Sequence, residues 1–177
     1  IRFFEHPGID PRGIVRALVK NIAAGNSKEG ASTITQQLAR NLYLSREKKI
    51  TRKLQEVILA LELERRYSKE EILEAYLNQI FYGANSNSVH SYGVQVAARN
   101  FFGKDVEKLT LAEAALLAGL PKNPTGYSPY KHLDAAKQRR SVVLHNMLTY
   151  ALINREQYEE AMDAPIKLAP QSKLDRK

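Results

Sequence analysis

The stretch ITRKLQEVILALELE, residues 50–64, repeats apolar side chains at intervals of three and four positions. This interval matches one face of an α-helix. Arg52 and Glu56 lie one turn apart on the opposite, outward side of that helix. The residues that we expect it to bury are Ile50, Leu54, Val57, Ile58 and Leu61.

Spacing alone leaves two interpretations of this charged pair. As a surface ion pair, Arg52 and Glu56 contribute about 0.3 kcal/mol to the helix. Alternatively, Arg40, Arg52 and Lys53 form a positive pocket that holds Glu56 as a carboxylate beside a diphosphate. Between Arg40 and Arg66 there are eight basic residues and four acidic ones, so the basic excess of the chain is concentrated here.

Helical signals recur along most of the chain. Asp10 followed by Pro11 predicts the start of a helix with an apolar stripe over residues 14–22. Capping-box pairs precede apolar runs at Ser68 and Glu71, at Thr110 and Glu113, and at Asn154 and Gln157. Helical periodicity also covers residues 32–44, 49–67, 93–101 and 134–153, whereas turn residues predict loops at 25–31, 82–91 and 121–132. No segment alternates cleanly over the length of a strand, so the predicted fold class is mainly α.

The composition limits the class of protein. With 177 residues, 44% of them hydrophobic, the chain can bury one substantial core, and we expect a single domain. The formal net charge of +8 favours an anionic partner, which is nucleic acid, an acidic membrane surface or a phosphorylated substrate. The absence of cysteine excludes disulfides and thiolate metal sites, and the four histidines lack metal-ligand spacing. No stretch approaches the roughly 20 apolar residues that span a bilayer, and the abrupt start at Ile1 is typical of a fragment.

The segment STITQQLARN, residues 32–41, is a second amphipathic stretch. Its helical spacing places Thr33, Gln37 and Arg40 along one side. This polar side is either the solvated face of an ordinary helix or a row of donors that meets an anion near a helix N-terminus. The motif by itself does not decide between the two.

Five segments, taken in order, resemble the motifs of glycosyltransferase family 51, the peptidoglycan glycosyltransferases of class A penicillin-binding proteins and their monofunctional relatives. They are FFEHPGID at 3–10, ASTITQQ at 31–37, RKLQE at 52–56, EILEAYLN at 71–78 with FFGK at 101–104, and EAALLAGLPKNP at 113–124. The likeness extends over residues 3–165. Three departures are Ala31 in place of a usual glycine, Arg40 in place of a usual lysine, and a longer turn at 83–93.

The resemblance implies a lysozyme-like helical domain with a larger globular lobe and a smaller membrane-proximal lobe. Residues 1–165 are then an N-terminally truncated glycosyltransferase domain, and residues 166–177 begin a linker or tail. The family's first motif opens with a Glu-Asp pair, which in this register falls immediately before Ile1. Because that Glu is the family's general base, we expect the fragment to be inactive by itself.

The implied reaction polymerises lipid II into glycan strands and releases undecaprenyl diphosphate, with inversion at the anomeric carbon. The second functional carboxylate of the family matches Glu56. This residue either holds a divalent cation, Mg²⁺ or Mn²⁺, or orients the basic residues around the leaving diphosphate, and no organic cofactor is implied. The substrate-binding residues that the resemblance carries over are Phe3, His6, Ser32, Thr33, Gln36, Gln37, Arg40, Asn41, Arg52, Lys53, Lys122 and Thr125.

The resemblance also implies partners and a location. These are lipid II, the growing lipid-linked glycan and the outer face of the bacterial cytoplasmic membrane, with an upstream transmembrane helix as the anchor. The polar tail favours a fused transpeptidase domain in the parent protein, and no nucleic acid is expected. Ile14, Leu18, Lys20 and Ile22 either lie against the membrane or pack in the core.

Other functions fit parts of the sequence. A lysozyme-like glycan hydrolase or lytic enzyme needs an acid carboxylate but no basic diphosphate pocket, so Arg40, Arg52 and Lys53 argue against it. A basic helical nucleic-acid-binding module accounts for the net charge, but it needs a continuous basic stripe, whereas basic and acidic residues are interleaved here. A scaffold without activity fits the truncated chain.

Overall fold

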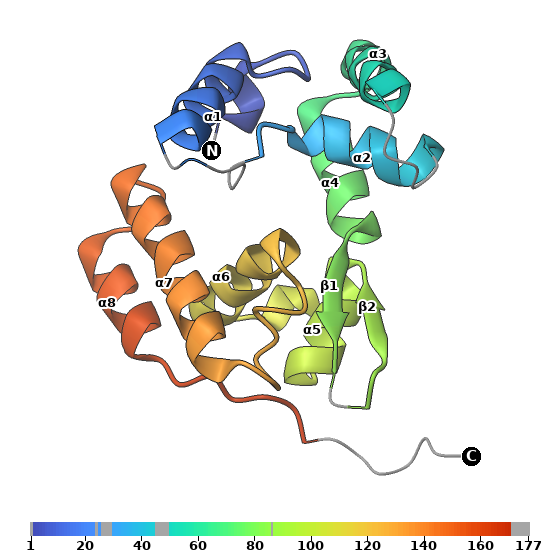
Figure 1. The fold of residues 1–177 in the computed structure, drawn as a ribbon. Coiled ribbons are helices and arrows are strands. Elements are labelled where there is room, and N and C mark those ends of the chain that lie inside the picture. The colour runs from blue at the N-terminus through green and yellow to red at the C-terminus, as the bar shows by residue number, and fades with distance from the viewer. Residues whose placement is uncertain (1, 24, 26–29, 45–49, 86, 171–177) are drawn as a thin grey trace. The chain divides into compact units, whose positions relative to one another are not determined.

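The computed structural model of the chain describes residues 2–23, 25, 30–44, 50–85 and 87–170 (Figure 1). Helices dominate this part of the chain, which confirms the predicted mainly α fold class. The chain divides into two compact units, Ile1–Gln79 and Ile80–Lys177.

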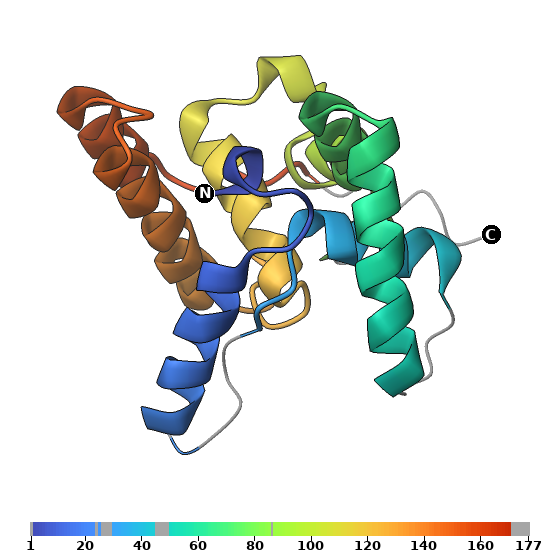
Figure 2. The ribbon, with the colours of Figure 1, turned by 90° about the horizontal axis from the view of Figure 1, so that it is seen from above.

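The first unit is built around the helix that contains residues 34–43. Its elements are η1 (Phe3–Glu5), α1 (Pro11–Ala23), α2 (Ile34–Tyr43), α3 (Ile50–Arg66) and α4 (Lys69–Gln79). Helix α2 crosses α3 and packs against both α3 and α4 (Figure 1 and Figure 2). The buried apolar side chains of these three helices are Leu38, Ala39, Ala60, Leu63, Ile72 and Tyr76.

Side-chain caps determine where two of these helices begin. Thr33 accepts a hydrogen bond from the Gln36 amide, and the Gln36 side chain accepts one from the Thr33 amide, so a complete capping box starts α2. The predicted box of Ser68 and Glu71 is present at the start of α4, again with both bonds formed. Each box satisfies amide groups that the first turn of a helix leaves without partners.

The apolar stripe predicted to be buried on α3 is exposed instead. Leu54 and Ile58 expose 63% and 58% of their surface, and Leu61 is exposed as well. The buried face of α3 carries Glu56 together with Ala60 and Leu63, and Val57 is half-buried, while the side chain of Ile50 lies outside the described residues. The prediction was wrong because periodicity tells which residues share a face and not which face another helix covers.

Helix α1 also exposes its apolar residues, which contradicts the alternative that they pack in the core. The exposed apolar residues of this helix are Ile14, Val15, Leu18, Val19 and Ile22, and Lys20 is exposed beside them. Only Gly13 and Ala17 are buried in α1. Among the described residues, no helix combines the length and the apolar character needed to cross a membrane.

In the part of the second unit that the structure describes, a short hairpin is combined with four α-helices. Its elements are β1 (Phe81–Ala84), β2 (His90–Tyr92), α5 (Val94–Phe102), η2 (Val106–Lys108), α6 (Leu111–Gly119), η3 (Leu120–Lys122), α7 (Leu133–Thr149) and α8 (Arg155–Asp163). Helix α6 packs against α7, and α7 lies beside α8 (Figure 1 and Figure 2). Capping boxes start α6 at Thr110 and α8 at Asn154, as predicted.

The antiparallel hairpin β1–β2 takes up the two ends of the loop predicted at 82–91. Phe81 pairs with Tyr92, and Ala84 pairs with His90. Residue 86 in the predicted loop lies outside the described residues. The two strands have four and three residues, which is too short for an alternating pattern to be recognised in a sequence.

One predicted helix boundary also shifts at the C-terminal side. Helix α7 ends at Thr149, four positions before the predicted end. Residues 166–170 carry no helix or strand, and the Ala169 amide donates to the Phe101 carbonyl at 2.8 Å. The start of the tail is therefore bound to α5, and residues 171–177 lie outside the described residues.

Candidate functional site

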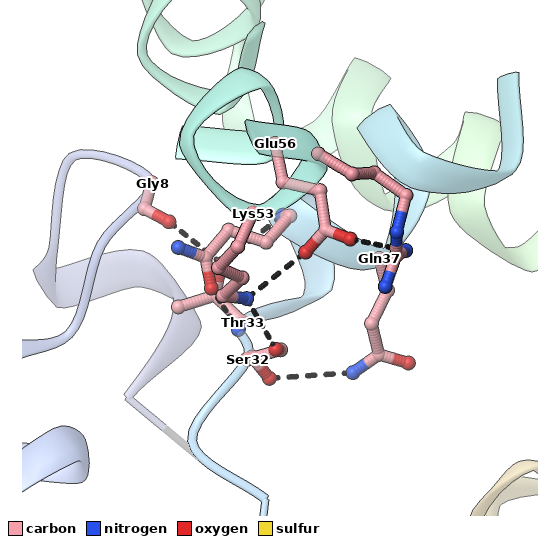
Figure 3. A network of polar contacts seen from close by, with 8 residues as sticks. Gly8, Ser32, Thr33, Gln37, Lys53 and Glu56 are labelled. Carbon is pink, nitrogen blue, oxygen red and sulfur yellow. Dashed lines mark hydrogen bonds and ion pairs between the residues drawn. The ribbon is translucent and has the colours of Figure 1, made fainter. Parts of the chain in front are cut away.

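A buried carboxylate with two cationic partners lies at the centre of the first unit. Glu56 exposes only 1% of its surface. Arg52 Nη1 donates to one carboxylate oxygen at 2.6 Å, and Lys53 Nζ donates to the other at 2.9 Å (Figure 3). Because α3 places Arg52 and Lys53 one turn before Glu56, a single helix supplies all three groups. The burial of Glu56 makes this more than the surface ion pair that spacing allowed.

The N-terminal turn of α2 is joined to this carboxylate through Lys53. Lys53 Nζ also donates to Ser32 Oγ at 2.8 Å (Figure 3). Gln37 Nε2 donates to the Ser32 carbonyl at 3.3 Å, and Tyr76 donates from its hydroxyl to Gln37 Oε1 at 3.3 Å. Residues of α2, α3 and α4 thus form one polar network around Glu56.

Thr33 joins α2 to the segment that follows η1. Its Oγ1 accepts from the Gln36 amide at 3.1 Å and donates to the Gly8 carbonyl at 2.6 Å (Figure 3). Both Thr33 and Gln36 are buried, so their polar groups are engaged within the fold. The hydroxyl of Thr33 therefore fixes the distance between residues 3–8 and the start of α2.

Residues 3–8 form a turn that buries Phe3 and His6 in the first unit and leaves Phe4, Glu5 and Pro7 exposed. Phe3 and His6 are both buried, and their rings meet edge to face at 6.5 Å between centroids. Gly8 has φ of +82°, and a Cβ built at this position would lie 2.9 Å from Glu64 Cγ and 3.0 Å from the Ala60 carbonyl oxygen. Only glycine fits this close approach of the turn to α3.

The electrostatic environment of His6 favours its neutral form. Burial lowers the pKa of His6 from its ordinary value of 6.5, and the nearby ammonium of Lys69 lowers it further. Its Nδ1 has no hydrogen-bond partner among the described residues. The imidazole is therefore neutral in the folded protein at pH 7.

We expect the His6 ring to titrate with a midpoint below pH 6.5, measured from its Cε1–H resonance in an NMR pH titration. Because the pKa of His6 is lower in the folded protein than in the unfolded chain, the neutral imidazole stabilises the folded state. This contribution to the free energy of unfolding is complete above pH 6.5 and is lost as the pH falls toward the midpoint of His6 in the folded protein. A matched titration of the His6→Gln variant should lack this loss. A His6 midpoint at or above 6.5 would contradict the burial and charge effects described here.

The first unit contains most of the candidate site residues. Arg40 is half-buried and lies near Tyr76, whose pKa is raised by burial against the opposing effect of Arg40. Asn41 is exposed at the end of α2. Lys122 and Thr125 are exposed in the second unit, in η3 and in the turn after it. The candidates joined in the network around Glu56 and Thr33 are Ser32, Thr33, Gln36, Gln37, Arg52 and Lys53.

The donor set around Glu56 does not fit a divalent cation. Hydrogen bonds from Arg52 and Lys53 occupy both carboxylate oxygens. In the described part of the chain, no group of three or more histidine, cysteine, aspartate or glutamate residues is placed to hold a metal ion. Cations at bonding distance repel a metal ion from the same carboxylate, so the orienting role of Glu56 fits its neighbours better.

Sequence reasoning missed two charged residues that contact the turn of residues 3–8. Lys69 donates to the His6 carbonyl at 2.6 Å, although 63 positions separate the two residues. Glu64 pairs with Lys69 at 2.7 Å. A pattern of helical spacing cannot reveal this pair, because the two residues belong to different helices and meet across the corner between them.

Comparisons with known proteins give consistent matches. The family described as transglycosylase matches residues 1–148. The penicillin-binding protein 1A of Aquifex aeolicus is 49% identical over 171 residues, which cover 97% of this chain and 23% of that protein. Penicillin-binding protein 1B of Haemophilus influenzae is 42% identical over 176 residues, which cover 99% of this chain and 22% of that protein.

A solved structure gives the same result. The crystal structure of penicillin-binding protein 1A from Haemophilus influenzae matches 77% of this chain and 16% of that chain, with 36% sequence identity and a TM-score of 0.53. The chain spans about a fifth of the length of the curated relatives it matches.

Proposed function

Because this chain belongs to the transglycosylase family, we propose that it is the peptidoglycan glycosyltransferase domain of a bacterial class A penicillin-binding protein. Its substrates are lipid II and a growing glycan linked to undecaprenyl diphosphate. The relatives are four to five times as long as the part that matches, so we place a transpeptidase domain in the same parent protein.

The reaction joins the 4-hydroxyl of lipid II to the anomeric carbon of the growing glycan. The hydroxyl oxygen attacks that carbon from the side opposite the diphosphate, which inverts the configuration. The bond between the carbon and the diphosphate oxygen breaks, and undecaprenyl diphosphate leaves. The proton of the hydroxyl passes to a general base, which the resemblance of residues 3–10 to the first family motif places on a glutamate just upstream of Ile1.

The buried Glu56 with its two cations supports this function most directly. A departing diphosphate gains negative charge, which positively charged groups already held in place stabilise best. Glu56 orients Arg52 and Lys53 through hydrogen bonds of 2.6 and 2.9 Å. The Arg52 side chain is 20% exposed and donates to Glu56 only from Nη1 among the hydrogen bonds of the described residues, so the guanidinium has further N–H groups with which to meet an anion.

The same charges argue against a glycan hydrolase. A hydrolase needs a carboxylic acid that donates a proton to the leaving sugar oxygen. Glu56 accepts hydrogen bonds from two cations, which is the environment of a carboxylate and not of a proton donor. We therefore assign Glu56 to orientation of the diphosphate-binding cations, and no step of the reaction is assigned to a metal ion.

Helix α1 supports a location at the membrane surface, where the lipid-linked substrates lie. Its exposed apolar residues share the helix with Arg12, Arg16 and Lys20, which follow one another at intervals of four positions and are exposed. An apolar stripe beside a basic stripe suits the boundary between acyl chains and anionic headgroups. We therefore place this domain at the outer face of the cytoplasmic membrane, with the anchor elsewhere in the parent protein.

Polymerisation of lipid II by the natural full-length protein tests this function. We expect glycan chains, separated on a gel, to lengthen with time in the presence of lipid II. A penicillin that blocks the transpeptidase should leave this polymerisation unchanged. If the folded protein makes no polymer and instead cleaves finished glycan, the hydrolase alternative replaces the proposed function.

A further inference from the structure

A lysine at the start of α4, Lys69, contacts the turn formed by residues 3–8. Lys69 Nζ donates to the His6 carbonyl at 2.6 Å and lies 4.5 Å from the centre of the Phe3 ring. Its side chain is only 19% exposed. One ammonium group therefore contacts the turn twice, once through a hydrogen bond and once through a cation–π contact.

Glu64 fixes the position of that ammonium group. Its carboxylate lies 2.7 Å from Lys69 Nζ and is 8% exposed. Thr35, which is fully buried on α2, donates from Oγ1 to the same carboxylate at 2.5 Å. A half-buried lysine needs an anionic partner, and the Glu64 carboxylate is that partner. The hydrogen bond from Thr35 on α2 orients this carboxylate.

Close packing shows that the turn rests directly on this pair. The built Cβ of Gly8 lies 2.9 Å from Glu64 Cγ, so the backbone of the turn touches the side chain that carries the charge. Thr33, from the other side, donates to the Gly8 carbonyl at 2.6 Å. The turn is therefore held between the start of α2 and the corner of α3 and α4.

We propose that Lys69 and Glu64 are positioning residues for glycosyl transfer, which hold residues 3–8 in the place that the reaction requires. This inference rests on the proposed function, because Phe3 and His6 are among the substrate-binding residues that the family resemblance implies. Lys69 contacts only their backbone and ring, so it acts through them. A displacement of about 1 Å in a reacting constellation can cost about 10²-fold in rate.

The test compares Lys69→Met with Ile72→Val in the natural full-length protein. Methionine keeps the length of the lysine side chain and removes the charge and the donors. Ile72 is buried on the same helix, and its shortening destabilises the core without removing a charge or a hydrogen-bond donor. We expect Lys69→Met to lower kcat for lipid II polymerisation about 10- to 100-fold, with KM within about twofold, while Ile72→Val keeps the kcat of the unmodified protein.

A second measurement follows the turn itself and needs no activity. The Gly8 amide donates to the His6 carbonyl at 3.0 Å, so its hydrogen exchange reports on the turn. We expect faster exchange at Gly8 in Lys69→Met than in Ile72→Val. If the unmodified protein makes no polymer, the proposed function fails. If the unmodified protein is active but Lys69→Met changes neither the exchange at Gly8 nor kcat, only the positioning role is overturned.

The interaction between Lys69 and Glu64 provides a further check through the variant Glu64→Gln. This variant also tests the proposal if Lys69→Met fails to fold. Glu64→Gln keeps the shape of the glutamate and weakens its hold on Lys69, so kcat should fall with little change in KM. Because both residues act through one contact, the double variant should lose no more activity than Lys69→Met alone. Multiplied losses in the double variant, or a Glu64→Gln enzyme with the kcat of the unmodified protein, would refute the proposal.

Discussion

Replacement of Glu56 by glutamine is expected to lower the rate of glycan polymerisation by about 10²- to 10³-fold, the range seen when one preorganised electrostatic contact to a transition state is lost. Glutamine has the shape of glutamate and no charge. Arg52 and Lys53, now 2.6 and 2.9 Å from the carboxylate, would lose the anion that orients them. Initial rates of polymerisation, followed on glycan gels with the full-length protein, measure the effect.

Glu62 provides a matched control on the same helix. It also bridges two cations, since Arg65 donates to it at 2.8 and 2.9 Å and Arg66 donates as well. Hydrogen bonds from these arginines lower the pKa of Glu62 to about 2, so it is ionised throughout the assay range. Glu62 is 39% exposed, whereas Glu56 is 1% exposed.

Glu62→Gln should therefore leave polymerisation unchanged, because exposed ion pairs contribute little. Equal rates for Glu56→Gln and the unmodified protein would remove Glu56 from the mechanism. Equal losses in the two variants would instead show that the charge of α3, and not the buried site, controls the rate.

Local sequence signals predicted most of the helix starts. The pairs at Ser68 and Glu71, at Thr110 and Glu113, and at Asn154 and Gln157 all form the expected bonds. A capping box depends only on residues three positions apart, so the sequence contains all the information that it needs. The same spacing at Thr33 and Gln36 also forms a box, which was not predicted from the sequence because Thr33 was placed on a polar stripe with Gln37 and Arg40.

Burial was not predictable in the same way. The spacing of Arg52 and Glu56 correctly placed them one turn apart, yet their helix turned the apolar residues Leu54 and Ile58 outward and Glu56 inward. Which face is covered depends on how α2 and α3 pack, and that contact involves residues far apart in the chain. The family resemblance, and not the periodicity, singled out Glu56 as functional.

The contact between residues 3–8 and α4 has no local signal at all. Lys69 meets His6 across 63 positions of sequence. In the sequence, Lys69 has the features of an ordinary first-turn residue of a helix, next to the capping serine. Only the folded chain brings the two together, and for the same reason the positive φ of Gly8 could not be inferred from its place in the first motif.

Thr33→Val is expected to cost about 1.5–5 kcal/mol of unfolding free energy and to reduce polymerisation at the same time. Valine keeps the size of threonine and removes its hydroxyl. Loss of the helix cap costs about 0.5–2 kcal/mol. The buried Gly8 carbonyl, which accepts from Thr33 at 2.6 Å, would lose its bond at a cost of about 1–3 kcal/mol. Urea unfolding followed by circular dichroism measures the change.

Two further variants separate the roles of this hydroxyl. Thr33→Ser keeps both hydrogen bonds, so it should retain most of the stability and activity that valine removes. Thr110→Val removes a cap with the same capping-box geometry at the start of α6, in the other unit, and should cost only the cap, about 0.5–2 kcal/mol. If the two valine variants are equally destabilised, the bond from Thr33 to Gly8 contributes nothing measurable. A larger loss at Thr33, rescued by serine, would show that this one hydroxyl both starts α2 and holds the turn at Gly8, while Lys69 holds it at His6.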